Sequence, residues 1–313
     1  MKKIKIFNKD CRNLSSFIQD KIDFIVFSPP YWNLRDYKSV NQIGHNQSYT
    51  EYLQAMKKTF EECFQVLRDE RFMAINIGTV VSNEGMKFVC GDFVKLCIES
   101  GFTFRKDIIW HKPKGTTKWQ RGATQFTQNP YPLNYNTNIN HEFILIFQKG
   151  ISTKNKKKTK PFNKIFTRDM AYSVWDIIPI NSPTLDEKHV APYPEEIPSR
   201  LIKLYTYKNE IVLDPFAGSG TTCKVAYELG RRSIAVELSK SYCSLIEKKI
   251  KNLKFDSYDD SAIYSENADL YLDKIEKKII KNQNELKKLL LERKKFYINN
   301  PKKNIKKQLK LFD

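Results

Sequence analysis

Short apolar runs alternate with longer segments of helical period along most of the chain. Residues 4–7, 22–27 and 72–77 are nearly continuous in apolar side chains, which is typical of strands buried on both faces. Between the last two runs, residues 49–67 repeat apolar side chains at steps of three and four, as an amphipathic helix does. We therefore expect strands and helices that alternate along the sequence.

The same alternation continues beyond these elements. The pattern predicts further strands at residues 104–110, 143–147, 211–213 and 233–236, and further helices at residues 88–99, 198–205 and 221–229. Gly101 and Gly230 follow two of these helices and suit C-terminal caps. This order of elements is typical of an α/β fold with a mostly parallel sheet and helices on both faces.

Three segments interrupt the alternation. Residues 112–140 have no clear period, and their lysines and arginine are interleaved with aromatic side chains, which suits contact with unstacked nucleic-acid bases. A solvated loop is the alternative. Residues 151–189 form a second irregular segment that begins with a lysine run. Residues 255–313 carry a narrow apolar stripe in a lysine-rich helix, which we expect to pack on the body or to pair with another helix. We therefore predict a domain at residues 1–254 and a helical extension at residues 255–313.

Composition narrows the classes of partner and compartment. The 313 residues carry a formal net charge of +19, which favours a phosphate backbone as partner, although a lysine-rich composition at every surface is the alternative. No apolar run approaches the roughly 20 residues of a membrane span, and the first residues form no signal segment. The six scattered cysteines disfavour a zinc site and fit reduced, buried thiols. We expect a cytoplasmic protein without membrane contact.

The segment Ser28-Pro29-Pro30-Tyr31-Trp32 follows the apolar run at residues 22–27, where a pocket forms at the end of a parallel strand. An aromatic amine is a weak nucleophile because its lone pair is delocalised, and two acceptors near its hydrogens favour attack. The Ser28 hydroxyl and the Pro29 carbonyl suit this task, and the prolines stiffen the turn. Tyr31 can stack on a base that has been flipped out of a duplex. A rigid structural turn is the alternative.

The segment Asp214-Pro215-Phe216-Ala217-Gly218-Ser219-Gly220 lies between a predicted strand and a predicted helix, where a glycine loop lets a ligand approach the backbone. It is not a Walker loop, because Thr221 follows the second glycine, and Cys223 stands where a dinucleotide fingerprint has its third glycine. Glu237, about 19 residues after Gly218, suits ribose hydroxyls. A ribose without a diphosphate indicates S-adenosylmethionine.

Together the two segments resemble the amino-methyltransferases of DNA, and the resemblance covers roughly residues 1–250. The catalytic segment precedes the cofactor segment, which is the circularly permuted order of the β class. The resemblance implies a Rossmann-like S-adenosylmethionine-dependent methyltransferase fold, here with a C-terminal helical extension. It also implies a site-specific enzyme of restriction-modification systems that uses S-adenosylmethionine and needs no metal.

The resemblance assigns roles to individual residues. It implies a catalytic role for Ser28, Pro29, Pro30, Tyr31 and Trp32. It implies cofactor contacts for Asp10, Cys11, Asp214, Phe216, Ala217, Gly218, Ser219, Gly220, Thr221, Thr222, Glu237 and Tyr193. Asp10 and Cys11 are expected near the adenine, and Tyr193 belongs to a segment, His189-Val190-Ala191-Pro192-Tyr193-Pro194, expected near the methionine part. Target recognition is expected at about residues 150–188, and DNA contact at about residues 112–140.

The first residue of the catalytic segment bears on the choice of base. Members of the family with serine there mostly methylate the N4 amine of cytosine, so Ser28 favours cytosine N4, with adenine N6 as the alternative. Cytosine C5 chemistry is disfavoured because no Pro-Cys nucleophile stands at the segment. A catalytically inactive DNA-binding subunit, an RNA methyltransferase and a structural dimer partner are further alternatives.

The resemblance also implies partners. Double-stranded DNA is the expected substrate, and a homodimer and a cognate restriction endonuclease are expected partners. The chain ends in Gln308-Leu309-Lys310-Leu311-Phe312-Asp313, which resembles short peptides that bind the bacterial replication clamp.

Overall fold

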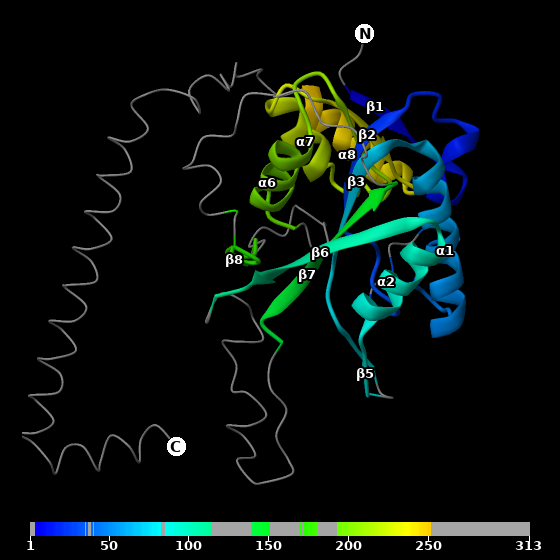
Figure 1. Cartoon of the computed structure of the whole chain (residues 1–313). Coiled ribbons are helices and arrows are strands. Elements are labelled where there is room, and N and C mark those ends of the chain that lie inside the picture. The colour runs from blue at the N-terminus through cyan, green and yellow to red at the C-terminus, as the bar shows by residue number, and fades with distance from the viewer. Residues whose placement is uncertain are drawn as a thin grey trace, which may run out of the picture. The chain divides into compact units, whose positions relative to one another are not determined.

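An eight-stranded sheet is the centre of the computed structural model (Figure 1). The structure describes residues 4–251 except 35, 37–38, 40, 83–84, 114–138, 151–169, 171 and 181–192, all within one of two compact units of the chain. In spatial order the strands are β1 (Ile4–Phe7), β10 (Arg232–Val236), β9 (Ile211–Asp214), β2 (Ile22–Phe27), β3 (Leu67–Ile77), β7 (His141–Lys149), β6 (Phe102–His111) and β8 (Val174–Asp176).

The strand directions confirm the mostly parallel sheet. Strands β1, β10, β9, β2 and β3 are parallel to one another, β7 is antiparallel to β3 and β6, and β8 is parallel to β6. Strands β2 and β9 are direct neighbours, with Phe24 opposite Val212 and Ile25 opposite Leu213. The segments that follow these two strands therefore leave the sheet at the same edge.

The β2–β9 pair is also tied at its opposite end. The Asp23 carboxylate is buried and accepts the Ile211 backbone N–H at 2.9 Å across a separation of 188 residues. The Arg68 guanidinium lies 2.8 Å from the same carboxylate, so its charge is compensated.

Helices cover both faces of the sheet, as the alternation predicts. The helical elements are η1 (Cys11–Ser16), α1 (Tyr49–Val66), α2 (Val89–Glu99), α6 (Glu196–Tyr205), α7 (Thr221–Glu228) and α8 (Lys240–Lys251). Helices α1 and α2 lie on one side of the sheet and α6 and α7 on the other (Figure 1).

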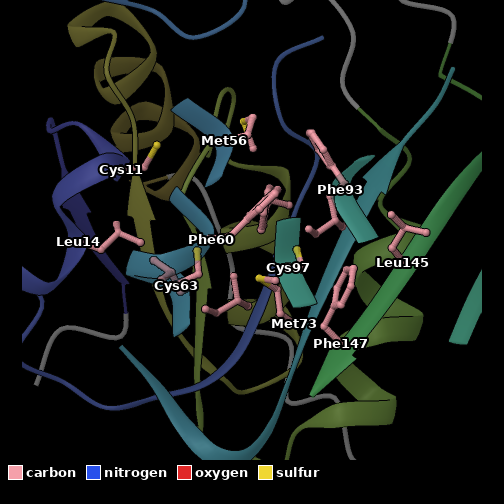
Figure 2. Packing of buried hydrophobic residues seen from close by; sticks show 14 of the residues in the cluster. Cys11, Leu14, Met56, Phe60, Cys63, Met73, Phe93, Cys97, Leu145 and Phe147 are labelled. Atoms are coloured by element: carbon pink, nitrogen blue, oxygen red, sulfur yellow. The ribbon is translucent and has the colours of Figure 1, made fainter. Parts of the chain in front are cut away.

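Two hydrophobic clusters hold these layers together. Ile25 and Phe27 of β2 join the cluster that contains Phe60 of α1 and Phe93 of α2 (Figure 2). The alternate residues Phe24 and Val26 join the cluster that contains Leu201 of α6 and Val225 of α7. Successive side chains of a strand point to opposite faces, so a continuous apolar run fills both clusters. All six cysteines are buried and free, as their spacing predicts.

Several elements differ from the sequence-based prediction. Strand β8 lies inside residues 151–189, which we expected to be irregular, because three residues are too few to show a period. The hairpin of β4 (Val80–Ser82) and β5 (Gly85–Lys87) and the helix α8 were not predicted. The predicted target-recognition segment lies largely outside the described residues. The predicted C-terminal helix and the segment Gln308–Phe312 lie entirely outside them. No helix in the described part of the chain is long and apolar enough to span a membrane.

Candidate active site

A cavity of about 420 Å³ lies at the carboxyl ends of the central strands. Its wall includes Ser28 after β2, Phe216 and Gly218 after β9, Glu237 after β10 and Asp10 after β1. Parallel neighbours present their carboxyl ends at one edge, so four segments that are distant in sequence meet there.

Most of the predicted site residues line this one cavity. Those in its wall are Asp10, Cys11, Ser28, Pro29, Pro30, Tyr31, Tyr193, Phe216, Ala217, Gly218, Ser219, Thr221 and Glu237. Four others, Trp32, Asp214, Gly220 and Thr222, do not line it. Gly220 belongs to the glycine loop itself, Asp214 ends β9 before the loop, and Thr222 lies in α7 after it.

Trp32, for which the resemblance implies a catalytic role, does not line the cavity and supports the catalytic segment from the side of α1. Its side chain is buried, its indole N–H donates to the Gln47 carbonyl at 2.8 Å, and its ring meets that of Tyr49 edge-on. The hydroxyl of Tyr52 donates to the Pro30 carbonyl at 3.0 Å. Aromatic side chains of α1 therefore fix the segment that carries Ser28.

The glycine loop depends on two left-handed backbone conformations. Gly218 has φ +50° and Gly220 has φ +82°, values that side chains rarely allow. A Cβ at Gly220 would lie 3.0 Å from Cγ1 of Ile246 on α8, so only glycine fits this close approach. The backbone of the loop therefore turns sharply into the N-terminus of α7.

The carboxylate of Glu237 closes the glycine loop. It accepts the Gly218 N–H at 2.9 Å and the Ser239 N–H at 2.8 Å. Burial raises the pKa of Glu237, while these backbone N–H groups favour its charged form. The carboxylate lines the cavity between the loop and β10, where it can meet the hydroxyls of a ribose.

Asp214 lies beneath the same loop. It is buried and accepts the Phe216 N–H at 2.9 Å, and burial raises its pKa to about 7. Thr222 hydrogen-bonds to the hydroxyl of Tyr193 and lies close enough to Asp214 to favour its charged form. This chain of polar groups connects the wall residue Tyr193 to the floor of the loop.

Asp10 is held at the start of η1. Its side chain accepts the Arg12 N–H at 2.8 Å and contacts the Arg12 guanidinium. Burial opposes the charged form, but the hydrogen bonds and the charge of Arg12 outweigh it and lower the pKa of Asp10. Asp10 is therefore a fixed carboxylate in the cavity wall.

Several wall residues have no role in the sequence-based site. Asn76, Trp110 and Glu142 were not predicted as site residues, and Lys112 was expected only as part of a DNA-contacting segment. Asn76 is the second-last residue of the predicted strand at residues 72–77, so its place at the carboxyl edge of the sheet is a usable signal. Trp110, Lys112 and Glu142 reach the cavity through the pairing of β6 with β7, which the sequence does not indicate.

The residues present fit a nucleoside cofactor. A close-approaching glycine backbone, a carboxylate at the end of the next strand and the apolar side chain of Phe216 lie together in the wall. They are the groups that a ribose and an adenine require.

Comparisons with known proteins agree with this assignment. The DNA methylase family profile matches residues 22–248. The type II methyltransferase M.MjaI of Methanocaldococcus jannaschii is 30% identical, over 79% of this chain and 90% of its own. M.SmaI of Serratia marcescens, another type II methyltransferase, is 26% identical, over 80% of this chain and 91% of its own.

A solved structure has the same architecture. The Thermus thermophilus protein TTHA0409, described as a DNA modification methylase and solved as a complex with S-adenosyl-L-methionine, superposes with a TM-score of 0.61. It is 28% identical and is matched over 78% of this chain and 93% of its own. The shared profile, the type II relatives and the common fold lead to one conclusion: this chain belongs to the DNA methylase family and is an S-adenosylmethionine-dependent DNA methyltransferase.

Proposed function

We propose that the protein transfers a methyl group from S-adenosylmethionine to the exocyclic N4 amine of a cytosine flipped out of double-stranded DNA. One observation carries the proposal: the segment Ser28–Tyr31 and the pair Gly218–Glu237 line the same cavity. An amine held at the first segment would therefore face a donor bound at the second.

The chain's own residues orient the reacting amine. The Ser28 hydroxyl and the Pro29 carbonyl accept hydrogen bonds from the amine and turn its lone pair toward the donor. The Tyr31 ring provides a surface on which the base stacks. S-adenosylmethionine supplies a methyl group on a sulfonium, which is already a strong electrophile. Gly218, Glu237 and Asp10 would hold the nucleoside part. No general base is needed before attack, because the amine nitrogen loses its extra proton to water after the N–C bond has formed and the S–C bond has broken.

Ser28 supports the choice of cytosine N4, through the resemblance of its segment to that of N4-cytosine enzymes. Adenine N6 is the alternative product. To decide between the two bases, the protein is expressed in a host that lacks DNA modification. One sample of the host DNA is digested to nucleosides, and another is sequenced by a method that detects modified bases. N4-methylcytosine at one sequence supports the proposal, and N6-methyladenine replaces it with the alternative. Unmodified DNA from a protein that binds the cofactor indicates an inactive DNA-binding subunit.

The partners belong to the same proposal. We propose that residues 150–188 recognise the target sequence and that the protein is cytoplasmic. We also propose that it forms a homodimer and has a companion restriction endonuclease. Binding of the replication clamp through Gln308–Phe312 is a separate hypothesis, and a pull-down in which the intact protein does not retain the clamp would refute it.

A further inference from the structure

A polar cluster lies beside the catalytic segment in the cavity wall, and its centre is Glu142. Oε2 of Glu142 accepts the Asn76 side-chain N–H at 2.7 Å, and Oε1 accepts from Nζ of Lys112 at 2.5 Å. The phenol of Tyr31 lies beside the same carboxylate and is influenced by its charge. The partners come from β3, from the end of β6 and from the loop after β2, and all four residues line the cavity.

The carboxylate is largely removed from water, with 15% of the Glu142 side chain exposed. A buried carboxylate persists when donors and an opposite charge compensate its lost hydration, and Glu142 has both. The ion pair of Glu142 and Lys112 lines the same cavity as the catalytic segment.

The backbone next to the cluster also makes room for it. A Cβ at Gly78 would lie 3.0 Å from Cγ of Glu142 and 3.5 Å from the Tyr31 hydroxyl oxygen. The absence of a side chain lets both groups sit against the strand end. The Gly78 N–H then donates to the Tyr31 hydroxyl at 3.1 Å.

Tyr31 is consequently held at its outer end by one hydrogen bond and by its contact with the cluster. Its hydroxyl accepts the Gly78 N–H, and the Glu142 side chain lies beside it. Burial and the neighbouring charge of Glu142 raise the pKa of Tyr31 well above its usual value, so the phenol keeps its proton. A ring held in this way is oriented before a base arrives, which lowers the entropy lost on binding.

Lys112 completes the cluster. Its ammonium lies 4.6 Å from the centre of the Trp110 ring and is paired with Glu142. The positive charge neutralises the carboxylate, so the cavity does not repel a polyanionic strand at the place where a base enters.

We propose that Glu142 is a positioning residue, which holds the Tyr31 ring and the Lys112 ammonium in the half of the cavity that receives the base. The inference rests on the proposed function, because it assigns that half to a nucleobase. Glu142 acts through its neighbours and does not itself react.

The test compares Glu142→Gln with the wild-type protein in methyl transfer to DNA. The amide keeps the shape of the side chain but cannot compensate the Lys112 charge. We expect kcat to fall about 10- to 100-fold, the scale of a misplaced reactant, while cofactor affinity by calorimetry is unchanged. Glu99→Gln is the matched control, because Glu99 pairs with Lys57 at 2.9 Å outside the cavity and should leave kcat unchanged.

A double-mutant cycle distinguishes positioning from a general structural effect. Tyr31→Phe keeps the ring and removes the hydroxyl that lies beside Glu142, so the double variant should lose little more activity than the worse single variant. Fully additive losses would show that the two residues act independently and would overturn the proposal.

An activity-independent measurement keeps the inference separate from the proposed function. The protein is labelled with 3-fluorotyrosine, and the ¹⁹F resonance that is missing from the spectrum of Tyr31→Phe is assigned to Tyr31. Glu142→Gln should shift or broaden this resonance. An unchanged resonance, or a changed one with wild-type kcat in an active enzyme, overturns the proposal. A wild type that methylates no DNA, together with a changed resonance, refutes the proposed function and leaves the positioning role supported.

Discussion

At the scale of single residues, the pKa of the Asp214 carboxyl is changed strongly by its surroundings. Asp214 is buried beneath the glycine loop, and burial raises its pKa from 3.8 to about 7, with a smaller contribution from the charge of Glu237. A carboxyl group that holds its proton more tightly in the folded chain than in the unfolded chain stabilises the fold at low pH. This stabilisation is complete below the unfolded pKa and is lost as the pH rises through the folded pKa.

Asp214→Asn should remove this dependence while keeping an acceptor for the Phe216 N–H. The unfolding free energy of the variant relative to wild type should rise between about pH 4 and pH 7, by up to about 4 kcal/mol. Denaturant unfolding of both proteins across this range measures the difference. If the difference does not change with pH, the Asp214 carboxyl is not protonated in the folded state.

Ser28 provides a second prediction at this scale. Ser28→Ala removes one of the two proposed acceptors of the amine, so kcat should fall about 10- to 100-fold, which corresponds to a lost hydrogen bond of about 1.4–2.8 kcal/mol. Cofactor affinity should not change. Ser244→Ala on α8 is the control, because that hydroxyl is exposed and bonds only to its own helix at 3.2 Å. A Ser28→Ala enzyme with wild-type kcat contradicts the assignment.

At the scale of elements, the turn from β9 into α7 has to be made by glycine. Gly220→Ala adds left-handed strain and a contact with Ile246, so we expect a loss of about 2–4 kcal/mol in unfolding free energy and weaker cofactor binding. Gly85→Ala separates the two causes, because Gly85 has φ +103° and no atom within 4 Å of an added Cβ. Its loss should be about 1 kcal/mol. Equal losses in the two variants would show that the contact with Ile246 costs nothing.

The sequence predicts those parts of the fold that repeat over several residues. Continuous apolar runs indicated β2 and β9, and the three- and four-residue steps indicated α1, because each pattern follows from burial of the element's own side chains. Strand β8 and the hairpin β4–β5 are too short for such a pattern. The cluster of Glu142 was not predictable, because it depends on which strands pair.

The same reasoning applies to the site. Residues after β2 and β9 could be placed together once a parallel sheet was expected, since their strand ends share an edge. Trp32 could not be placed, because nothing in a five-residue segment shows whether an aromatic ring faces the cavity or the neighbouring helix. Its contact with Tyr49 depends on where α1 packs.

At the scale of the whole molecule, the net charge of +19 predicts salt-dependent DNA binding. Affinity for a duplex of unrelated sequence should fall about 100-fold between 50 and 200 mM salt, the loss expected when about four phosphates are neutralised. Fluorescence anisotropy with a labelled duplex measures it, and cofactor affinity over the same range is the internal control. An affinity for DNA that is independent of salt would show that the basic residues do not contact phosphate.

The tie between Asp23 and the Ile211 N–H also has a consequence for synthesis. A ribosome must deliver 188 further residues after Asp23 before β2 meets its neighbour β9, and until then β2 presents an open strand edge. A nascent chain therefore spends most of its translation with this edge unpaired and without a cavity. Premature termination before residue 211 should yield an aggregating fragment that depends on chaperones, with no residual transfer activity.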